Sequence, residues 1–342
     1  MLGQIIQSVW YSRSRLAWIL WPLSLPFLLL VLAKRAFYQL EIFKVSSFNK
    51  PIVVVGNLSV GGTGKTPFIT SLASYLASKN ISVGLVSRGY KADIKSFPHQ
   101  VTEEDTAFSV GDESYMQFRK LKLPIVIAPK RADAVRYLLK NNQVDVVISD
   151  DGLQHYSMAR DIEVVLFDGA RQFGNKLILP FGPLREPIIR LDSVDYVVQN
   201  GEQENKFTHH KVKLVEVSLV NISSKEEKQL NYLSEQEVVA IAGIGNPERF
   251  FASLEKFVTI KSKTVYPDHH AFSLRDFDHV HEDKLVVMTE KDAVKCESFA
   301  KKNWYFLKVE MQVDSVLLEQ IEQSVISLKD STESKNTSVR KN

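Results

Sequence analysis

Six consecutive residues combine backbone flexibility, one cation and one hydroxyl group: Gly61, Gly62, Thr63, Gly64, Lys65 and Thr66. Glycines let successive backbone N–H groups turn towards phosphate oxygens, a lysine can reach the β- and γ-phosphates of a nucleotide, and a threonine hydroxyl can ligate Mg²⁺. A helix-like stretch, TPFITSLASYLAS, continues from this segment, and a helix N-terminus favours anions. The segment is therefore predicted to bind ATP together with Mg²⁺.

This segment departs from the phosphate-loop pattern G-x-x-x-x-G-K-[ST] at one position, because Ser59 stands where the pattern has glycine. The G-K-T end of the pattern is intact. A glycine-rich turn that binds no ligand is the alternative. The apolar run Ile52–Val55 is typical of a buried parallel strand, and its place directly before the loop favours the nucleotide site.

Paired carboxylates, Asp150 and Asp151, end another apolar run that begins at Val146. A carboxylate at the end of such a strand can hold Mg²⁺, directly or through water, opposite Thr66. Adjacent strand residues point in opposite directions, so we expect only one of the two acids to contact the metal directly. The alternative is that each acid caps a turn.

Another pair of acids, Asp112 and Glu113, follows Gly111 and precedes the helical pattern SYMQFRKL. In the first turn of a helix, carboxylates interact favourably with the helix dipole, and this structural role would be sufficient. The functional alternative is that one of them is the general base for a substrate hydroxyl. Spacing alone leaves both interpretations open.

Further polar residues could contact a substrate. Arg185 lies in the stiff, apolar loop Leu179–Pro187 and could bind a phosphate bidentately, or it could form a surface ion pair with Glu186. Arg88 and His155 follow predicted strands and are also candidates for substrate binding, although a single histidine is more often structural.

Two histidines, His269 and His270, stand beside Asp268 just before a predicted helix cap at Ser273. A metal site would need a third ligand at a helical spacing, and the sequence offers none. The interpretation we favour is that a histidine here orients or polarises another catalytic group.

Alternating apolar runs and helical patterns must position these groups. The alternation predicts an α/β fold of the P-loop NTPase type, with a doubly wound and mainly parallel sheet. In such sheets ligands bind at the carboxyl ends of the strands, where the polar clusters lie. The predicted strands are Ile52–Val55, Val83–Val86, Pro124–Ile127, Val144–Ile148, Ile162–Phe167 and Val194–Val198.

The length of 342 residues suggests more than one domain, and polar loops after Lys206 precede a second, smaller α/β set. We expect a membrane-associating segment at residues 1–40, a nucleotide-binding domain at 41–225, the smaller domain at 226–330 and a disordered tail at 331–342. The smaller domain should contain the strands Val238–Ala242, Phe257–Lys261, Lys284–Val287 and Trp304–Val309 and the helices Asn246–Leu254 and Ser273–His281.

The charge and cysteine content narrow the class of partner. The chain has 43 basic and 40 acidic residues, so its net charge of +3 gives no case for binding nucleic acid. The single cysteine, Cys296, excludes an internal disulfide framework and agrees with a reducing compartment.

The N-terminal stretch Leu16–Ala33 contains no charged residue, and basic residues flank it on both sides. At ~1.5 Å per residue it would form a helix of ~27 Å, at the short end for a full membrane span, and Pro22 and Pro26 should kink it. It could insert into one leaflet or cross the bilayer. A buried core helix and a cleaved signal peptide are the alternatives, and the missing A-x-A site argues against the second.

Several long motifs occur in a fixed order behind this stretch: GNLSVGGTGKTP, SRGYK, GDE, KR, DDGLQH, FGPLREP, AGIGNPERF, PDHHAF and MTEKDAVK. With them the chain resembles the tetraacyldisaccharide 4′-kinase family, the lipid A kinases, from about residue 5 to 328. The resemblance implies transfer of the γ-phosphoryl group of ATP, with Mg²⁺, to the 4′-hydroxyl of a tetraacyl disaccharide 1-phosphate. It also implies a location at the cytoplasmic face of a bacterial inner membrane.

The resemblance assigns roles to individual residues. It implies that Asp112 is the base and forms a dyad with His269, the first histidine of the P-D-H motif. The paired acids at residues 150–151 become the Walker-B-like acids, and Arg185 and Glu186 become substrate ligands. Domains that each contribute one member of the dyad would assemble the base when they close.

Two other functions remain as alternatives. A membrane-bound P-loop ATPase that partitions or targets macromolecules could carry the same loop, but that class commonly has a second lysine near the loop start, where this chain has Ser59 and Val60. A soluble nucleotide or cofactor kinase would leave Leu16–Ala33 unexplained.

Overall fold

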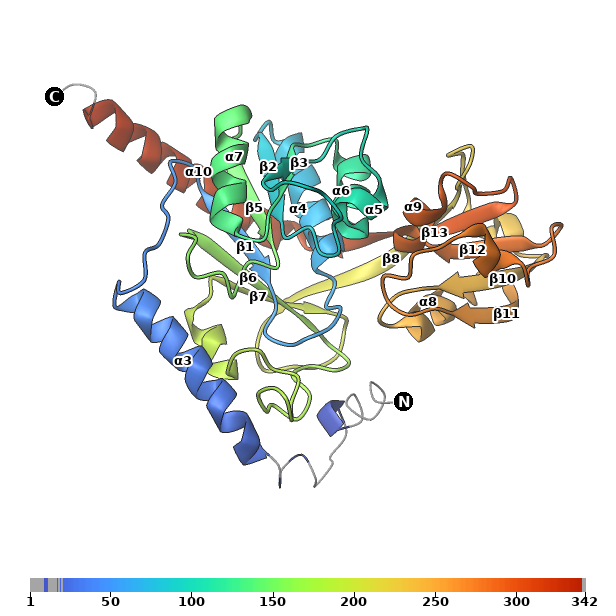
Figure 1. Cartoon of the computed structure of the whole chain (residues 1–342), viewed down its shortest axis with the longest axis horizontal. Helices are drawn as coiled ribbons and strands as arrows, with labels where there is room; N and C mark the ends of the chain where they lie inside the picture. Colours follow the sequence, from blue (N-terminus) through green and yellow to red (C-terminus); the bar gives the residue numbers. More distant parts are fainter. Residues whose placement is uncertain (1–8, 12–16, 18, 20, 340–342) are drawn as a thin grey trace.

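The computed structural model describes residues 9–11, 17, 19 and 21–339. One mixed sheet extends through both parts of the molecule, in the order β11-β10-β12-β13-β8-β7-β6-β1-β5-β2-β4-β3, with β9 paired to β8 (Figure 1). The pairs β13–β8, β8–β9 and β3–β4 are antiparallel, and the other neighbours are parallel. The predicted α/β fold with a mainly parallel sheet is confirmed.

The larger part, residues 41–209 together with α10, holds the parallel strands that the sequence predicts. Every residue of β1, β5 and β6 is buried, because helices cover both faces of the sheet. Helices α4, α6 and α10 pack on one face, and α7 packs on the other. The strands are β1 (Ile52–Gly56), β2 (Val83–Ser87), β3 (His99–Gln100), β4 (Ile125–Ile127), β5 (Val146–Asp150), β6 (Ile162–Asp168) and β7 (Tyr196–Asn200). The helices are α4 (Lys65–Ser78), α5 (Ala107–Val110), α6 (Asp112–Leu121), α7 (Arg131–Asn141), η2 (Ile188–Ser193) and α10 (Ser315–Val339).

The smaller part, residues 222–303, has two apolar clusters of its own, one on each face of β10. Its parallel strands lie close to their predicted positions. Its elements are β9 (Glu227–Lys228), η3 (Leu230–Leu233), β10 (Glu237–Ala242), α8 (Pro247–Leu254), β11 (Thr259–Val265), η4 (Leu274–Phe277), β12 (Leu285–Thr289) and α9 (Glu290–Cys296).

The helix expected at Ser273–His281 is only the 3-10 turn η4. The predicted cap does form, because Ser273 and Asp276 make a reciprocal capping box. The following residues, Asp278, His279, Val280 and His281, all have low helix propensity, and the turn ends at Phe277.

Two long antiparallel strands, β8 (His210–Asn221) and β13 (Trp304–Val313), run between the two parts (Figure 1). No strand was predicted for β8, which lies among the polar loops expected after Lys206. Its first residues pair with β7, while the rest pairs with β13. Residues such as Lys213 and Val217 are exposed, and β8 is thus a half-exposed strand with mixed polarity.

Helix α10 lies on the larger part, whereas the expected boundaries placed most of it in the smaller domain. Leu317, Ile321 and Val325 are buried in the same cluster as α4. Tyr75 of α4 also donates a hydrogen bond of 2.7 Å to Glu322. The backbone of α10 extends to Val339, and residues 340–342 of the expected tail lie outside the described residues.

The apolar N-terminal stretch ends in a 3-10 turn, η1 (Trp21–Ser24), and a helix, α3 (Leu25–Gln39). Pro22 lies in η1 and Pro26 lies in the first turn of α3, where proline is tolerated, so neither stands in the interior of α3. Residues 21–39 are long and apolar enough to cross a membrane, and only 6% of that window is buried. This exposure contradicts the core-helix alternative. Residues 16, 18 and 20 of the predicted segment lie outside the described residues.

Candidate active site

The phosphate loop joins the end of β1 to the start of α4, as the sequence predicts. Gly64 has φ +92°, and a Cβ atom there would lie 2.5 Å from Nδ2 of Asn200. This amide donates a hydrogen bond of 3.1 Å to the Thr63 carbonyl, and Asn57 donates one of 3.3 Å to the Gly61 carbonyl. Two asparagines, one directly after β1 and one at the end of β7, therefore hold the loop in shape.

Lys65, the first residue of α4, points back across the loop. Its ammonium nitrogen is 3.1 Å from Oδ1 of Asn57 and 3.4 Å from Oδ1 of Asp151. Arg185 approaches the same carboxylate at 3.1 Å. Burial alone would raise the pKa of Asp151, but the charges of Lys65 and Arg185 outweigh it and place that pKa at about 2. Asp151 thus remains ionised between two cations.

Asp150 has different surroundings. It ends β5 and is buried, and burial together with the charge of Glu113 raises its pKa to about 7. Within the described ranges, no hydrogen bond or ion pair reaches its carboxylate oxygens, although Arg131 donates a hydrogen bond of 3.0 Å to its backbone carbonyl. A buried carboxylate without a direct cationic partner fits a divalent cation. Asp151 lies beyond the end of β5 with φ +50°, so the alternation of side chains along a strand does not set its direction.

Asp112 and His269 meet across the boundary between the two parts, although 157 residues separate them in the chain. Asp112 opens α6 and is 6% exposed, and His269 lies in the loop after β11. Nδ1 of the imidazole is 2.9 and 3.0 Å from the two carboxylate oxygens. The imidazole packs edge-on against the ring of Tyr90, with 4.9 Å between the ring centroids. Lys91 donates a hydrogen bond of 3.3 Å to the His269 carbonyl.

The charge of Asp112 is stabilised from several sides. Burial acts to raise its pKa, but the hydrogen bond with His269 and the positive charges of Lys291 and Lys295 outweigh burial and lower it. Asp112 is therefore an ionised hydrogen-bond acceptor at neutral pH. This arrangement goes beyond what a favourable position at a helix N-terminus requires.

The four predicted substrate residues lie in different surroundings. Arg88 is exposed just after β2, whereas burial and the nearby charge of Arg131 lower the pKa of His155 to about 4. Arg185 contacts Asp151 and does not form the surface ion pair with Glu186. Glu186 is itself buried, and this burial raises its pKa. The Tyr156 hydroxyl donates to Glu186, and the Arg190 guanidinium lies 3.7 Å from its carboxylate.

Residues 16–326 match the sequence profile of the family described as tetraacyldisaccharide-1-P 4′-kinase. The chain belongs to this family. The tetraacyldisaccharide 4′-kinase of Legionella pneumophila (strain Corby) is 45% identical over 315 residues, which are 92% of this chain and 95% of the relative. That of Haemophilus influenzae (strain 86-028NP) is 42% identical over 305 residues, 89% and 91% of the two chains. The crystal structure of LpxK from Aquifex aeolicus in complex with ATP superposes with a TM-score of 0.77 at 27% identity, covering 92% of this chain and 99% of that one.

Several residues of this kinase that support the site were not predicted from the sequence. Asn57 and Asn200 brace the phosphate loop, and Lys291 and Lys295 of α9 approach Asp112 at 3.9 and 4.0 Å. The motif MTEKDAVK could have indicated the two lysines. They stand four residues apart, after a threonine that caps a helix. That spacing places both lysines on one face of α9.

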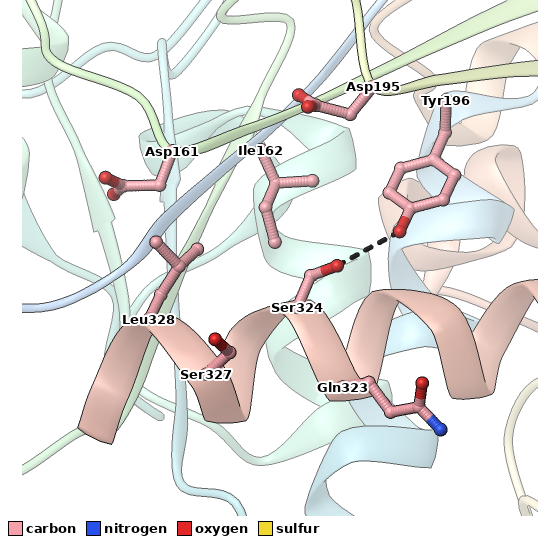
Figure 2. Close-up of a pocket in the computed structure, with 8 residues that line it drawn as sticks. All are labelled: Asp161, Ile162, Asp195, Tyr196, Gln323, Ser324, Ser327 and Leu328. Atoms are coloured by element: carbon pink, nitrogen blue, oxygen red, sulfur yellow. Dashed lines mark hydrogen bonds between the residues drawn. The ribbon is translucent and has the colours of Figure 1, made fainter. Parts of the chain in front are cut away.

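A cavity of about 580 Å³ in the kinase lies away from these groups, between the amino ends of β6 and β7 and helix α10 (Figure 2). Four of its polar groups are already engaged with one another or with the backbone. The Tyr196 hydroxyl is 3.1 Å from that of Ser324, and Asp161 and Asp195 each accept a hydrogen bond from a backbone N–H. Because ligands of such sheets bind at the opposite, carboxyl ends, we do not assign the active site to this cavity.

Gly111 controls where the kinase places Asp112, and this leads to a prediction. Gly111 has φ +86°, and a Cβ atom there would lie 2.6 Å from the Tyr90 carbonyl oxygen. Gly111→Ala should therefore cost ~1–3 kcal/mol of backbone strain and shift the start of α6. We expect turnover to fall ~10–100-fold with little change in ATP affinity. Steady-state kinetics and calorimetric titration with ATP measure the two effects, and wild-type turnover would show that α6 does not depend on this glycine.

Proposed function

We propose that this protein transfers the γ-phosphoryl group of ATP to the 4′-hydroxyl of a tetraacyl disaccharide 1-phosphate in lipid A biosynthesis. The observation that carries the proposal is the presence of a phosphate loop and a carboxylate–imidazole pair at one edge of the sheet. Ser114 of α6 contacts Ser87 at the carboxyl end of β2, at 3.3 Å, and the charge of Glu113 reaches Asp150. Family membership supports the same reaction.

In the proposed mechanism, the loop N–H groups and Lys65 bind the triphosphate and stabilise charge on the transferred group. Asp150 and the Thr66 hydroxyl would hold Mg²⁺, which supplies further charge neutralisation when bound. Asp151 is already paired with Lys65 and Arg185, and its role would be to orient the lysine. This division follows from the different surroundings of the two adjacent acids.

Asp112 would accept the proton of the 4′-hydroxyl during in-line transfer. Its low pKa keeps it ionised, and a loose transition state requires little base strength before the phosphorus–oxygen bond has formed. His269 would orient the carboxylate from the smaller part. Arg88 and Arg185 are the proposed phosphate-binding groups, while Glu186, buried against Tyr156 and Arg190, would shape the wall of the site.

One experiment tests this function. The full-length protein is incubated in detergent with ATP and a tetraacyl disaccharide 1-phosphate, and mass spectrometry follows the lipid. We expect a product heavier by one phosphoryl group, carried at the 4′ position. ATP hydrolysis without a phosphorylated lipid would contradict the proposal and favour the ATPase alternative.

We also propose that α3 inserts into the cytoplasmic face of the inner membrane. Phe27 and Leu28 pack against the larger part, whereas Leu29 and Leu30 are 65% and 69% exposed. Lys34 donates a hydrogen bond of 3.1 Å to the Gln154 carbonyl, close to the paired acids at the end of β5. The helix would therefore hold the site next to the lipid surface.

This leads to a prediction for the double substitution of Leu29 and Leu30 by aspartate. Because each aspartate in a membrane-buried helix costs ~2.5–3.5 kcal/mol, we expect the protein to move from the membrane pellet to the supernatant after ultracentrifugation. Both side chains are exposed, so thermal stability should change little. Val316→Asp, at a 51% exposed position on α10, is the matched control and should remain in the pellet. Equal pelleting of all three proteins would place the membrane contact elsewhere.

A further inference from the structure

The ammonium group of Lys291, the second residue of α9, lies among acceptors from both parts of the molecule. It is 3.0 Å from Oε1 of Glu113, 3.2 Å from Oδ1 of Asp268 and 3.2 Å from Nε2 of His269. Asp112 lies slightly further away at 3.9 Å. Burial would lower the pKa of Lys291, but these three carboxylates raise it above its usual range. Lys291 is thus a charged group in direct contact with the dyad.

The number of donors on this ammonium group determines the protonation of the imidazole. A protonated lysine has three N–H donors and no acceptor, and the three short contacts use all of them. Nε2 of His269 also faces Oδ1 of Asp268, but at 3.7 Å, beyond hydrogen-bond distance. Because the ammonium can only donate, its 3.2 Å contact favours an Nε2 that accepts and carries no proton. The ring proton then lies on Nδ1, which donates to Asp112 at 2.9 to 3.0 Å.

A metal ion does not explain this cluster better. Ligand atoms of Asp112, Glu113 and His269 lie within 4.8 Å of one another, a spacing that could hold a cation. The Lys291 ammonium already contacts two of these groups directly and neutralises the third at 3.9 Å. A divalent ion at the same place would be repelled by it. The lysine itself therefore supplies the positive charge here.

We propose that Lys291 is a positioning residue that holds His269 as the neutral Nδ1–H tautomer, so that Asp112 remains an ionised acceptor directed at the substrate. The proposal rests on the proposed function of Asp112 as the base. Without the lysine, Nε2 is free to take up a proton, and the imidazolium that forms would bind Asp112 more strongly and weaken it as an acceptor. A flip to the Nε2–H tautomer would instead remove the donor to Asp112.

The protein offers a matched control for the loss of an ion pair between the same two helices. Lys120 of α6 and Glu290 of α9 lie 3.5 Å apart, partly exposed, and neither has a described hydrogen bond or ion pair to the dyad. Lys120→Met thus removes an interhelix ion pair but leaves the His269 contacts unchanged. Lys291→Arg preserves the charge and the donors at the critical position.

The test is nitrogen NMR of the full-length protein in detergent, labelled with ¹⁵N at its 8 histidines and assigned through a His269→Gln variant. We expect wild type, Lys291→Arg and Lys120→Met to show a protonated Nδ1 and an unprotonated Nε2 at neutral pH. Lys291→Met should lose this signature. An Nε2–H tautomer in wild type, or an unchanged spectrum in Lys291→Met, would overturn the assignment.

Kinetics separate a positioning role from a structural one. Lys291→Met should lower kcat ~10–100-fold with KM for ATP within about twofold, and Lys120→Met should remain within about twofold of wild type. An equal kcat loss in Lys120→Met would assign the effect to the interface between the helices and refute the proposal. Since the spectra need no substrate, a protein without 4′-kinase activity would refute the proposed function while leaving the tautomer test intact.

Discussion

Lys65→Ala is expected to lower turnover by at least ~10³-fold, because a preorganised cation at a transferred phosphoryl group is among the largest contributors to such catalysis. Stability should fall by only ~1 kcal/mol or less, since the side chain packs little and its contacts are polar. Its partner Asp151 keeps a second cation in Arg185. Phosphorylation of the lipid by radiolabelled ATP and thermal unfolding measure the two effects separately.

Lys79→Ala serves as the comparison, because Lys79 is an exposed lysine at the far end of the same helix. It should match wild type in both measurements. Near-normal turnover of Lys65→Ala would show that the loop does not hold the reacting phosphates. A large fall in unfolding temperature for this variant would instead assign Lys65 a structural role.

Asp112→Asn should lower turnover by ~10²–10⁴-fold while ATP affinity changes little, because it removes the proton acceptor and preserves the shape of the side chain. If Asp112 only favoured the dipole of α6, the same change would cost ~0.3–1 kcal/mol of stability and leave turnover almost intact. Steady-state kinetics at saturating ATP distinguish the two outcomes. The observed contact with His269 is the reason we expect the large effect.

His269→Ala provides the second half of this test. Alone it should be severe, because Asp112 loses its donor and its orientation. The double variant should lose much less than the product of the two single losses, since residues that act as a unit are not additive. Multiplicative losses would show that the two residues act independently.

The strand, loop and helix around the predicted phosphate loop could be predicted from the sequence, because their determinants are local. A buried strand, a glycine-rich turn and a helix start follow one another within a few residues around Lys65, and the paired acids end the adjacent strand. The order of strands then brings these segments to one edge. Only this second step depends on pairing between distant segments, and the general rule for parallel sheets supplies it.

The remaining features depended on contacts that no local pattern encodes. The role of Asp112 was ambiguous, because its neighbours in the chain are also typical of a helix N-terminus. Only the contacts with His269 and Lys291 separate a catalytic role from a structural one. The strand β8 was missed because its polarity reflects a half-exposed position between the two parts. The placement of α10 on the larger part was likewise not predicted, since its apolar residues give no indication of which part they cover.

The placement of α10 has a consequence for how the protein folds during its synthesis. Chains emerge from the ribosome at ~5–20 residues per second, and domains generally fold as they appear. Here the strands of the larger part are complete at Asn200, but the cluster around α4 also needs Leu317, Ile321 and Val325, roughly 115 residues later in the chain. The core around α4 therefore remains unfinished until α10 has left the ribosome.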